Sequence, residues 1–320
     1  MKRRQLQLIK LTLALFTVPL LFVASSVQAV DWGSVQGKDV VLFYPGQASW
    51  EWALTQSDHS GAKKFREGKD CTECHKQEEG DIGAKIVSGK KLEPNPIAGK
   101  PGSVTVNVKT ANDGDKLYVH FEWTEPASAG GNKMDADVKT RVTMMLDDGH
   151  VTEATRAGCW GTCHDDAEGM ASAAAGKEIT KYLAQSRIKV TRSGGGENFK
   201  PQAELDKLLS DGVYMEYWQA SIANDNSATP VDGYILDKRH KNDTPAVAVQ
   251  AEFNNGKWSV TLSRKLTGAG AHHKDVTAGK TYSVGFAIHA DNVKHRYHYV
   301  SLRHTLALDQ GSADFVAVKK

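Results

Sequence analysis

Two pairs of cysteines, each followed directly by a histidine, are the residues best suited to chemistry in this chain of 320 residues. The first pair lies in CTECH at residues 71–75, and the second lies in CWGTCH at residues 159–164. C-x-x-C-H is the attachment motif of c-type haem, in which both thiols add across the haem vinyl groups and the histidine ligates the iron. The two motifs therefore predict two covalently bound c-type haems. The residues assigned to them are Cys71, Cys74, Cys159 and Cys163 as attachment sites and His75 and His164 as iron ligands.

Other uses of the four cysteines fit the pattern less well. The two motifs contain every cysteine of the chain, so no thiol is left for a disulfide outside them. A disulfide within either pair would be strained and would not explain the adjacent histidine. Zinc modules usually keep both cysteine pairs close together, whereas a long strand-rich stretch separates these two. The second motif has three residues between its cysteines, a less diagnostic spacing that requires a bulged loop.

The ligand on the far side of each iron decides between electron transfer and catalysis. A second strong protein ligand gives an iron that only passes electrons, whereas an open position permits peroxide, oxygen or nitrogen-oxide chemistry. We expect His59 to lie over the first haem because it is close upstream of the first motif, with His289 as the main alternative. Both His289 and His298 fall on predicted late strands, which would support an iron ligand rigidly.

Four further residues have open interpretations. Met170 follows the second motif closely and is either a sulfur ligand or an ordinary core residue. Trp160 lies inside the second motif and either packs on the porphyrin or belongs to the core. His272 and His273 occupy a loop rich in Gly and Ala, where we expect them to be exposed.

The N-terminal residues 1–29 are typical of a secretory signal peptide. A basic start with four Lys and Arg residues precedes an apolar run at 11–24 that is short for a membrane span, and small residues at 27–29 suit cleavage. An uncleaved anchor is the alternative. We predict a periplasmic protein with no stable membrane insertion after cleavage, because bacterial c-type haem is attached outside the cytoplasm.

The charge balance of the chain bears on its partners. The net charge of +2 includes the four signal-peptide cations and no signal-peptide acid, so the mature chain carries −2. This balance disfavours nucleic acid as a partner. Redox partner proteins would dock on local charge patches. The acidic residues 78–81 are one candidate, although a solvated loop is the simpler interpretation.

Alternating apolar residues beyond about residue 100 predict many short strands. Valines at 104, 106 and 108 precede a turn at 112–115 and a second alternating run at 117–123, which indicates a hairpin. Another hairpin is expected across Asn254-Asn255-Gly256. Short strands joined by turns rich in Gly and Asn favour a β-sandwich. The other expected strands are 141–146, 187–192, 213–220, 246–253, 257–263, 281–289 and 298–308.

We expect helices to be few and short, at about 170–184 and 201–211. The fold class is thus mainly β, with a β-sandwich, an irregular haem-binding N-terminal extension and a few short helices. The expected organisation is a signal peptide at 1–29, a region at 30–100 that holds the first haem, and a sandwich at 101–320 that holds the second.

A family resemblance rests on several segments. LFYPGQASWEW at residues 42–52 leads through HSGA at 59–62 into the first motif. Together with Gly158-Cys159-Trp160 and the segments around His289 and His298, it resembles the cytochrome c-552 type of proteins. These belong with the haem-binding subunits of ethylbenzene dehydrogenase and dimethyl sulfide dehydrogenase. The resemblance covers nearly the whole mature chain and implies a β-sandwich that holds a haem between a sheet edge and loops.

The resemblance also implies how the second iron is completed. In the dehydrogenase subunits the haem is b-type, with Met and Lys as axial ligands. The Met position falls near residues 159–164, where a c-type motif stands instead, and the Lys position matches His298. The resemblance therefore implies His298 as the distal ligand opposite His164. It implies nothing for the first haem, whose motif lies in an extension that these subunits lack.

These patterns favour an electron carrier, not an enzyme. The predicted function is a periplasmic dihaem cytochrome that moves electrons from a membrane quinol-oxidising cytochrome to a terminal reductase. The alternatives are a peroxidase-like dihaem enzyme with one open iron site and an electron-transfer subunit of a larger oxidoreductase. The chain has no G-x-S-x-G and no P-loop pattern, so a hydrolase or a phosphate-loop enzyme has no support.

Overall fold

The computed structural model of the chain describes residues 30–46, 48, 50–55, 57–93, 95–127, 137–164, 181–190, 198–290 and 298–320. In the second motif it describes only the backbone of Cys159, Cys163 and His164. The predicted signal peptide at 1–29 and residues 170–180 of the helix predicted at 170–184, Met170 among them, lie outside the described residues. Residues Asp31–Lys320 form one compact unit. In the described part of the chain, no helix has the length and apolar character needed to cross a membrane.

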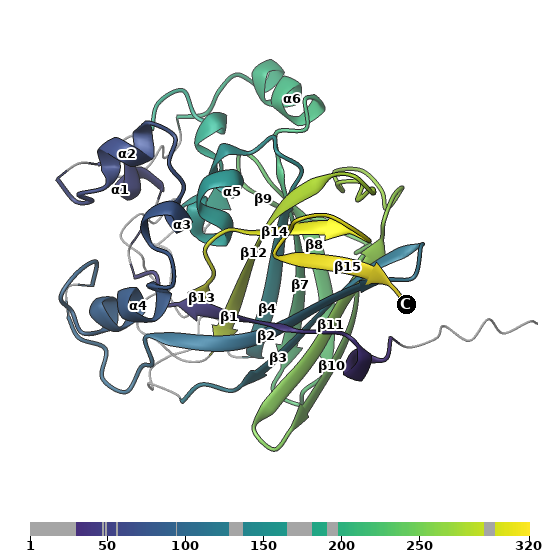
Figure 1. Ribbon diagram of the computed structural model, residues 1–320. Coiled ribbons are helices and arrows are strands. Elements are labelled where there is room, and N and C mark those ends of the chain that lie inside the picture. Colours follow the sequence, from purple (N-terminus) through teal and green to yellow (C-terminus); the bar gives the residue numbers. More distant parts are fainter. Residues whose placement is uncertain are drawn as a thin grey trace, which may run out of the picture. The chain divides into compact units, whose positions relative to one another are not determined.

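A sheet of thirteen strands makes up most of the described regular structure (Figure 1). Its neighbours run in the order β10-β11-β3-β2-β1-β13-β12-β4-β7-β8-β9, and β14 and β15 link β12 to β2. Neighbours along this path are antiparallel, whereas β15 is parallel to β14 and β2. The bounds are β1 Lys38–Phe43, β2 Ser103–Asn112, β3 Lys116–Thr124, β4 Val138–Asp147, β7 Met215–Ala223, β8 Ala228–Ile235, β9 Arg239–Lys241, β10 Ala248–Asn254, β11 Lys257–Lys265, β12 Thr281–Ala290, β13 His298–Val300, β14 His304–Leu308 and β15 Phe315–Lys319.

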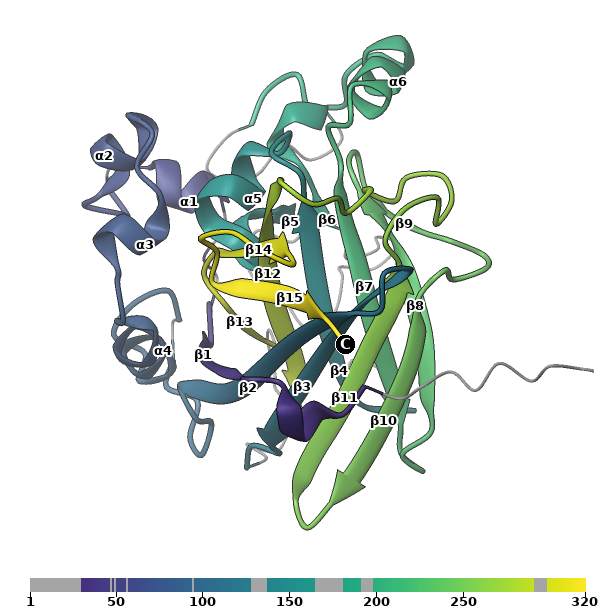
Figure 2. The same cartoon turned by 45° about the vertical axis from the view of Figure 1, so that its right-hand side comes forward.

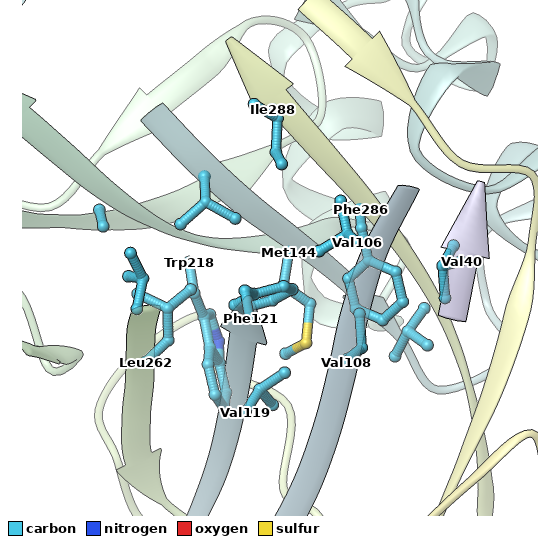
Figure 3. Close-up of a cluster of buried hydrophobic side chains, with 14 of the residues drawn as sticks. Val40, Val106, Val108, Val119, Phe121, Met144, Trp218, Leu262, Phe286 and Ile288 are labelled. Carbon is cyan, nitrogen blue, oxygen red and sulfur yellow. The ribbon is translucent and has the colours of Figure 1, made fainter. Parts of the chain in front are cut away.

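The thirteen strands confirm the mainly β fold class. The sheet also folds over, so that strands far apart in its order come into contact. Strands β11 and β7 are far apart in the strand order but in contact, and so are β10 and β8. Side chains from the facing strands fill the space between the two halves (Figure 3). Phe121, Trp218 and Phe286 are each no more than 1% exposed in this core. Burial of such large apolar groups is the main source of stability for the fold.

Both predicted hairpins are confirmed. Strands β2 and β3 pair in register, and so do β10 and β11. The second turn places Asn255 at φ 49° and Gly256 at φ 77°, the left-handed pair that a two-residue hairpin turn favours. The predicted strands at 141–146, 213–220 and 281–289 are confirmed as β4, β7 and β12, and α6 confirms the helix expected at 201–211.

Some predictions of elements are wrong. The stretch 187–190 forms no strand beyond an isolated bridge from Arg187 to Phe199. The guanidinium of Arg187 instead stacks between the rings of Tyr182 and Phe199, 3.9 and 4.0 Å from their centroids. Strand β1 was not expected and lies within the large sheet, because its continuous apolar run suits a strand covered on both faces.

The helices are short and several gather beside β12 and β13 (Figures 1 and 2). A small hairpin of β5 and β6 lies near them in sequence. The bounds are α1 Trp50–Leu54, α2 Ala62–Arg66, α3 Cys71–Cys74, α4 Glu79–Val87, α5 Thr152–Ala157, α6 Gln202–Ser210, the 3₁₀ helices η1 Trp32–Ser34, η2 Gly158–Gly161 and η3 Ala184–Ser186, and strands β5 Cys163–His164 and β6 Lys181–Tyr182. The end of the helix expected at 170–184 is therefore a strand and not a helix.

A second apolar cluster covers the outer face of β4, β7 and β12. Successive residues of a strand point to opposite faces. Phe286 and Ile288 face the inner core accordingly, whereas Ala287 joins the outer cluster with Val300 of β13. His289 continues the outward face of Ala287. The outer face, which α1, α2, α3 and α5 help to cover, is therefore where His289 points.

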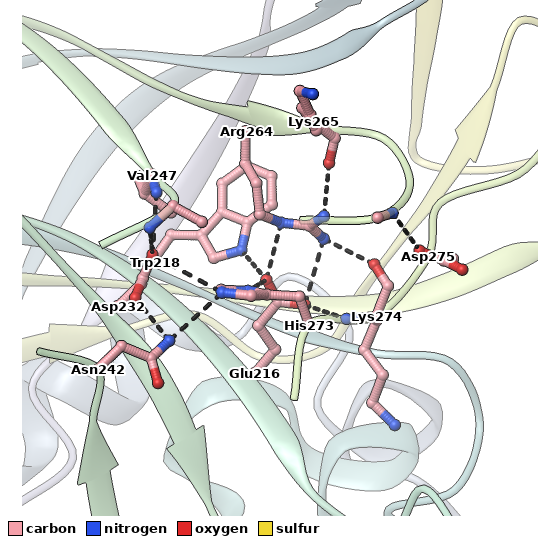
Figure 4. A network of polar contacts seen from close by, with 12 residues as sticks. Glu216, Trp218, Asp232, Asn242, Val247, Arg264, Lys265, His273, Lys274 and Asp275 are labelled. Atoms are coloured by element: carbon pink, nitrogen blue, oxygen red, sulfur yellow. Dashed lines mark hydrogen bonds and ion pairs between the residues drawn. The ribbon is translucent and has the colours of Figure 1, made fainter. Parts of the chain in front are cut away.

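A buried polar network joins β7 to the segment before β12 (Figure 4). Glu216 is fully buried, with its Oε1 2.9 Å from both Arg264 Nε and His273 Nδ1, and Trp218 Nε1 donates to it at 2.5 Å. The expected exposure of His272 and His273 is wrong for His273, whose side chain is 3% exposed. The buried carboxylate needs polar partners, and His273 is one of them.

Candidate haem sites

The first motif lies on α3, a single helical turn with a capping box at its N-terminus. The side chain of Asp70 accepts from the backbone N–H of Glu73 at 2.8 Å, and the Glu73 carboxylate accepts from the N–H of Asp70 at 2.8 Å. This capping box fixes a helix too short to form alone. As a result, Cys71 and Cys74 lie one turn apart and His75 ends the turn.

His59 and His75 lie close together in space although they are sixteen positions apart in sequence. Their ring centroids are 6.1 Å apart and the rings are tilted by 33°. Imidazole nitrogens bond metal ions at about 2 Å, so two rings that share one ion have centroids roughly 6 Å apart. The structure thus brings together the two residues that the sequence analysis paired at the first haem.

Both imidazoles are held through Nδ1. Nδ1 of His59 is 2.9 Å from the carbonyl oxygen of Ala53, and Nδ1 of His75 is 3.0 Å from the carboxylate of Glu78. Metal-bound histidines usually donate the second ring N–H to a carbonyl or carboxylate, which fixes the tautomer and the ring orientation. With Nδ1 as the donor, each ring presents Nε2 as the ligand atom. Trp52 packs on His59, with ring centroids 5.1 Å apart.

A cavity of about 500 Å³ contains this histidine pair. Both thiols and both imidazoles line it, and the rest of the wall is largely apolar. A pocket of this size and character is typical of a site for a small organic cofactor. Its main apolar lining residues are Phe43, Trp52, Phe65, Ile82, Ile86 and Leu302.

The residues of this cavity fit a covalently bound haem. Cys71 is buried and Cys74 is exposed, and no disulfide joins them. Burial raises the pKa of the Cys71 thiol to about 12, and the neighbouring Asp70 adds to the rise. A neutral thiol in an apolar wall suits a bond to a vinyl group better than it suits a metal thiolate, which needs a lowered pKa. The cavity wall thus supplies two thiols and two neighbouring imidazoles.

The second motif follows α5 and packs against the large sheet. Residues 158–161 form η2, which contacts β12 and β4, and His164 lies on β5 opposite Lys181 of β6. Two glycines permit close packing of this loop. A Cβ on Gly161 would lie 2.8 Å from the Cβ of Ala157, and a Cβ on Gly158, at φ 77°, would lie 2.7 Å from the backbone nitrogen of Arg303.

His289 and His298 are directly opposite each other on β12 and β13. Their ring centroids are 5.3 Å apart, with a tilt of 34°. Opposed residues of neighbouring strands project from the same face, so these rings stand side by side. They cannot ligate one iron from opposite sides, and the pair therefore offers one ligand and one neighbour.

The histidine pair lies on the side of the second motif. Burial lowers the pKa of His289 well below its usual value, and the positive charges of Lys181, Arg141 and Arg239 lower it further. Lys181 is the residue that pairs with His164. Burial of this kind favours the neutral imidazole, the form that binds metal ions. Among the described residues that line the first cavity, His59 and His75 are the histidines, and His289 is not one of them.

The two motifs are in physical contact. Trp160 of the second motif is 7% exposed and forms part of the wall of the first cavity. Nη2 of Arg156, at the end of α5, donates to the carbonyl of Lys69 at 2.9 Å. Nη1 of Arg303 lies 3.7 Å from the carboxylate of Asp70. The segments that carry the two motifs are therefore held beside each other.

The sequence analysis missed three contributors to these sites. Glu78 was considered only as part of an acidic patch, although its position three residues after His75 is a signal for a side-chain contact. The Ala53 carbonyl gives no sequence signal. Trp160 was expected at its own haem or in the core, and its place in the other cavity depends on tertiary packing.

Comparisons with known proteins identify the family of this chain. A family model described as ethylbenzene dehydrogenase matches residues 83–244 and 198–301. The matched region begins after the first motif and includes the second motif, His289 and His298. The first cysteine pair thus lies outside the part of the chain that this model matches.

Two curated cytochromes are similar over almost the full length. Cytochrome c-552 of Stutzerimonas stutzeri is 38% identical over 301 residues, which cover 93% of this chain and 93% of the relative. Cytochrome c-551 of Rhodocyclus tenuis is 28% identical over 293 residues, covering 91% of this chain and 100% of the relative. Among solved structures, a family 9 carbohydrate binding module from Caldicellulosiruptor kristjanssonii in complex with cellotriose aligns with 62% of this chain and 65% of its own, at a TM-score of 0.29 and 12% identity.

Proposed function

Because the chain belongs to the ethylbenzene dehydrogenase family and is a c-type cytochrome related to its haem-binding subunit, we propose that it is a dihaem electron carrier of the periplasm. The family resemblance expected from the sequence is confirmed. As a c-type cytochrome, the protein carries electrons on covalently bound haem. The proposal adds the number of haems, the ligands and the compartment.

The observation that carries the proposal is that His59 and His75 lie together in one cavity with both thiols of the first motif. An iron held by two imidazoles has no open position for a substrate, so it gains and loses electrons without binding one. The spacing of 6.1 Å between the ring centroids and the hydrogen bonds at both Nδ1 atoms support this role. The bound haem supplies the redox chemistry.

The protein residues orient, bury and connect the haems. The carbonyl of Ala53 and the carboxylate of Glu78 hold the imidazoles in place, which reduces rearrangement when the charge of the site changes. Apolar residues around the first cavity would bury part of a bound haem. At the second site we propose His164 and His298 as the ligands, with His289 as the neighbour of His298.

Contact between the motifs supports transfer of electrons within the molecule. Trp160 directly follows Cys159 and its indole lines the first cavity. A side chain of the second motif would thus contact a haem bound at the first. Such a molecule accepts an electron at one haem and releases it at the other.

The compartment and the partners follow from the motifs and the N-terminal sequence. Residues 1–29 have the pattern of an export signal, and c-type haem is attached outside the bacterial cytoplasm. We propose a membrane quinol-oxidising cytochrome as the donor and a terminal reductase as the acceptor.

Intact-mass measurement of the protein isolated from the periplasm tests the proposal. We expect the mass of the chain without residues 1–29 plus two haems. One haem would contradict the dihaem assignment, and the bare polypeptide would contradict covalent attachment. Ready binding of carbon monoxide by the reduced protein would favour a haem enzyme with an open iron.

A further inference from the structure

Two glutamates are buried between the segments that carry the motifs. Glu51 lies on α1, upstream of His59, and Glu153 lies on α5, upstream of Cys159. Their side chains belong to residues that are 3% and 1% exposed. Carboxylates are rarely this buried unless they are paired, so each requires an explanation.

Only one oxygen of each carboxyl group, Oε1, has a hydrogen-bond partner among the described residues. Oε1 of Glu153 accepts from the backbone N–H of Ala184 at 2.7 Å, and Oε1 of Glu51 accepts from the hydroxyl of Tyr182 at a long 3.4 Å. The Oε2 atoms of both glutamates are buried without a hydrogen-bond partner among the described residues. A carboxyl oxygen in this situation is best satisfied when it carries a proton.

Burial and the surrounding charges also favour the protonated form of Glu153. Burial raises the pKa of Glu153 to about 7, and the negative charges of Glu51 and Asp147 raise it further. Asp147 on β4 has its own cation, Lys274, at 3.9 Å. In the described part of the chain, neither Glu51 nor Glu153 forms an ion pair. A buried carboxyl without a cation near other carboxylates holds a proton more readily than an exposed one, and Glu153 is in this position.

A cation beside Tyr182 is engaged with other groups. The guanidinium of Arg187, next to η3, stacks on the Tyr182 ring at 3.9 Å and donates from Nη1 to the hydroxyl of Ser186 at 2.7 Å. Tyr182 itself is fully buried. The groups that face the carboxyl pair are therefore a phenol, a third carboxylate and a guanidinium that is already engaged.

The pair lies next to both haem sites. The carbonyl of Glu153 is so close to Gly161 of the second motif that a Cβ there would approach it to 2.9 Å. Tyr182 is paired in register with Cys163. On the other side, α1 contains both Glu51 and Ala53, whose carbonyl holds His59. A change of charge at either haem acts on these carboxyls through a protein interior with little screening.

We propose that Glu51 and Glu153 form a proton-binding site that is coupled to haem reduction. This inference rests on the proposed dihaem function. When a donor protein delivers one electron, the negative charge of the region rises by one, and the carboxyl pair takes up one proton from the solvent. When the electron leaves to the acceptor, the same proton returns to the solvent. The protein then carries an electron and a proton together.

The test is the midpoint potential of each haem between pH 5 and pH 9 in the dihaem protein. In the wild type we expect at least one potential to fall as the pH rises from about 6 to 8. The limit for one proton per electron is about 59 mV for each tenfold change in proton concentration. Glu153→Gln should remove most of this slope and Glu51→Gln should reduce it. Glu122→Gln is the matched control, since Glu122 is half exposed and pairs with Lys109 on the surface at 3.1 Å, and it should keep the slope.

The outcomes separate this inference from the proposed function. A protein with two haems and potentials that do not change with pH would overturn the inference and leave the dihaem carrier intact. A slope that persists in Glu153→Gln would assign the proton to another group and also overturn it. If a variant does not fold, proton uptake by the wild type during reduction at pH 7, followed with a pH-sensitive dye, decides the matter: measurable uptake is expected, and none would contradict the site. Fewer than two haems would instead refute the proposed function.

Discussion

The two histidine pairs of this protein are positioned in different ways. His59 and His75 come from loops and single-turn helices outside the large sheet, and a hydrogen bond at each Nδ1 fixes each ring. His289 and His298 come from adjacent strands within the sheet, and the strand register fixes their place. The first pair lines a cavity, with ring centroids 6.1 Å apart, whereas the second pair stands side by side on two strands at 5.3 Å.

The difference shows what each kind of support can do. A sheet places side chains rigidly but on one face, so a ligand on the opposite side of the iron must come from another segment. For the second site that segment is the CWGTCH loop. Loops can approach a cofactor from both sides, but they need hydrogen bonds to hold the ligands. The family model matches the sheet-based site and not the first motif, so the loop-based site is the part that this model does not describe.

Removal of each cysteine pair should have the largest effects on haem content and stability, and these effects should differ between the two sites. Replacement of Cys71 and Cys74 by Ser should lower the haem content from two to one and leave the sheet stable, because this motif lies outside it. Replacement of Cys159 and Cys163 by Ser should also leave one haem, but with a larger fall in melting temperature, because η2 packs on β12 and β4. Haem content by absorbance and thermal unfolding by circular dichroism provide the measurements. Equal melting temperatures for the two variants would contradict the distinction.

Exchange of the proposed distal ligands should change the potential of each haem separately. His59→Met should raise the potential of the first haem alone, and His298→Met that of the second alone, each by on the order of 0.1 V within the range of about 0.8 V that axial ligands cover. Redox titration followed by absorbance measures both potentials. His289→Gln serves as the control in the sheet, and a comparable shift in that variant would make His289 the ligand in place of His298.

A change of packing should affect only the second site. Gly161→Ala places a Cβ within 2.8 Å of Ala157, so we expect a loss of about 1–3 kcal/mol in stability and less haem at the second motif. Gly80→Ala in α4 is the matched control, because its Cβ would meet only Ser103 Oγ at 3.8 Å. Chemical unfolding and haem content check both variants. An unchanged Gly161→Ala protein would show that the bulged loop has room to move.

The smallest expected effect concerns the hydrogen bond to His75. Glu78→Gln keeps an acceptor but removes the negative charge that strengthens the imidazole as a ligand of oxidised iron. The potential of the first haem should rise by less than in His59→Met, and the second should not change. Voltammetry at one pH measures this, and a fall in the first potential would have the wrong sign for the account.

The sequence was most informative where a pattern is local. The Asn-Gly turn at residues 255–256 and the alternating runs before and after it depend only on neighbours in sequence. These patterns predicted the hairpins correctly. The strand expected at 187–192 failed because the stacking of Arg187 between two aromatic rings is a tertiary contact. Nearness in sequence led to the pairing of His59 with His75, and the structure places the two rings close together, whereas their role as ligands stays a prediction. The place of Trp160 in the first cavity and the burial of Glu51 and Glu153 could be seen only in the fold.

Low-temperature electron paramagnetic resonance of the oxidised protein tests the central claim most directly, because it distinguishes irons with two strong axial ligands from irons with an open position. His59 with His75 at the first site and His164 with His298 at the second predict two low-spin signals of equal intensity, each changed by one of the ligand variants. A high-spin signal of comparable intensity would show an open iron and contradict the assignment of this protein as an electron carrier with both haems fully ligated.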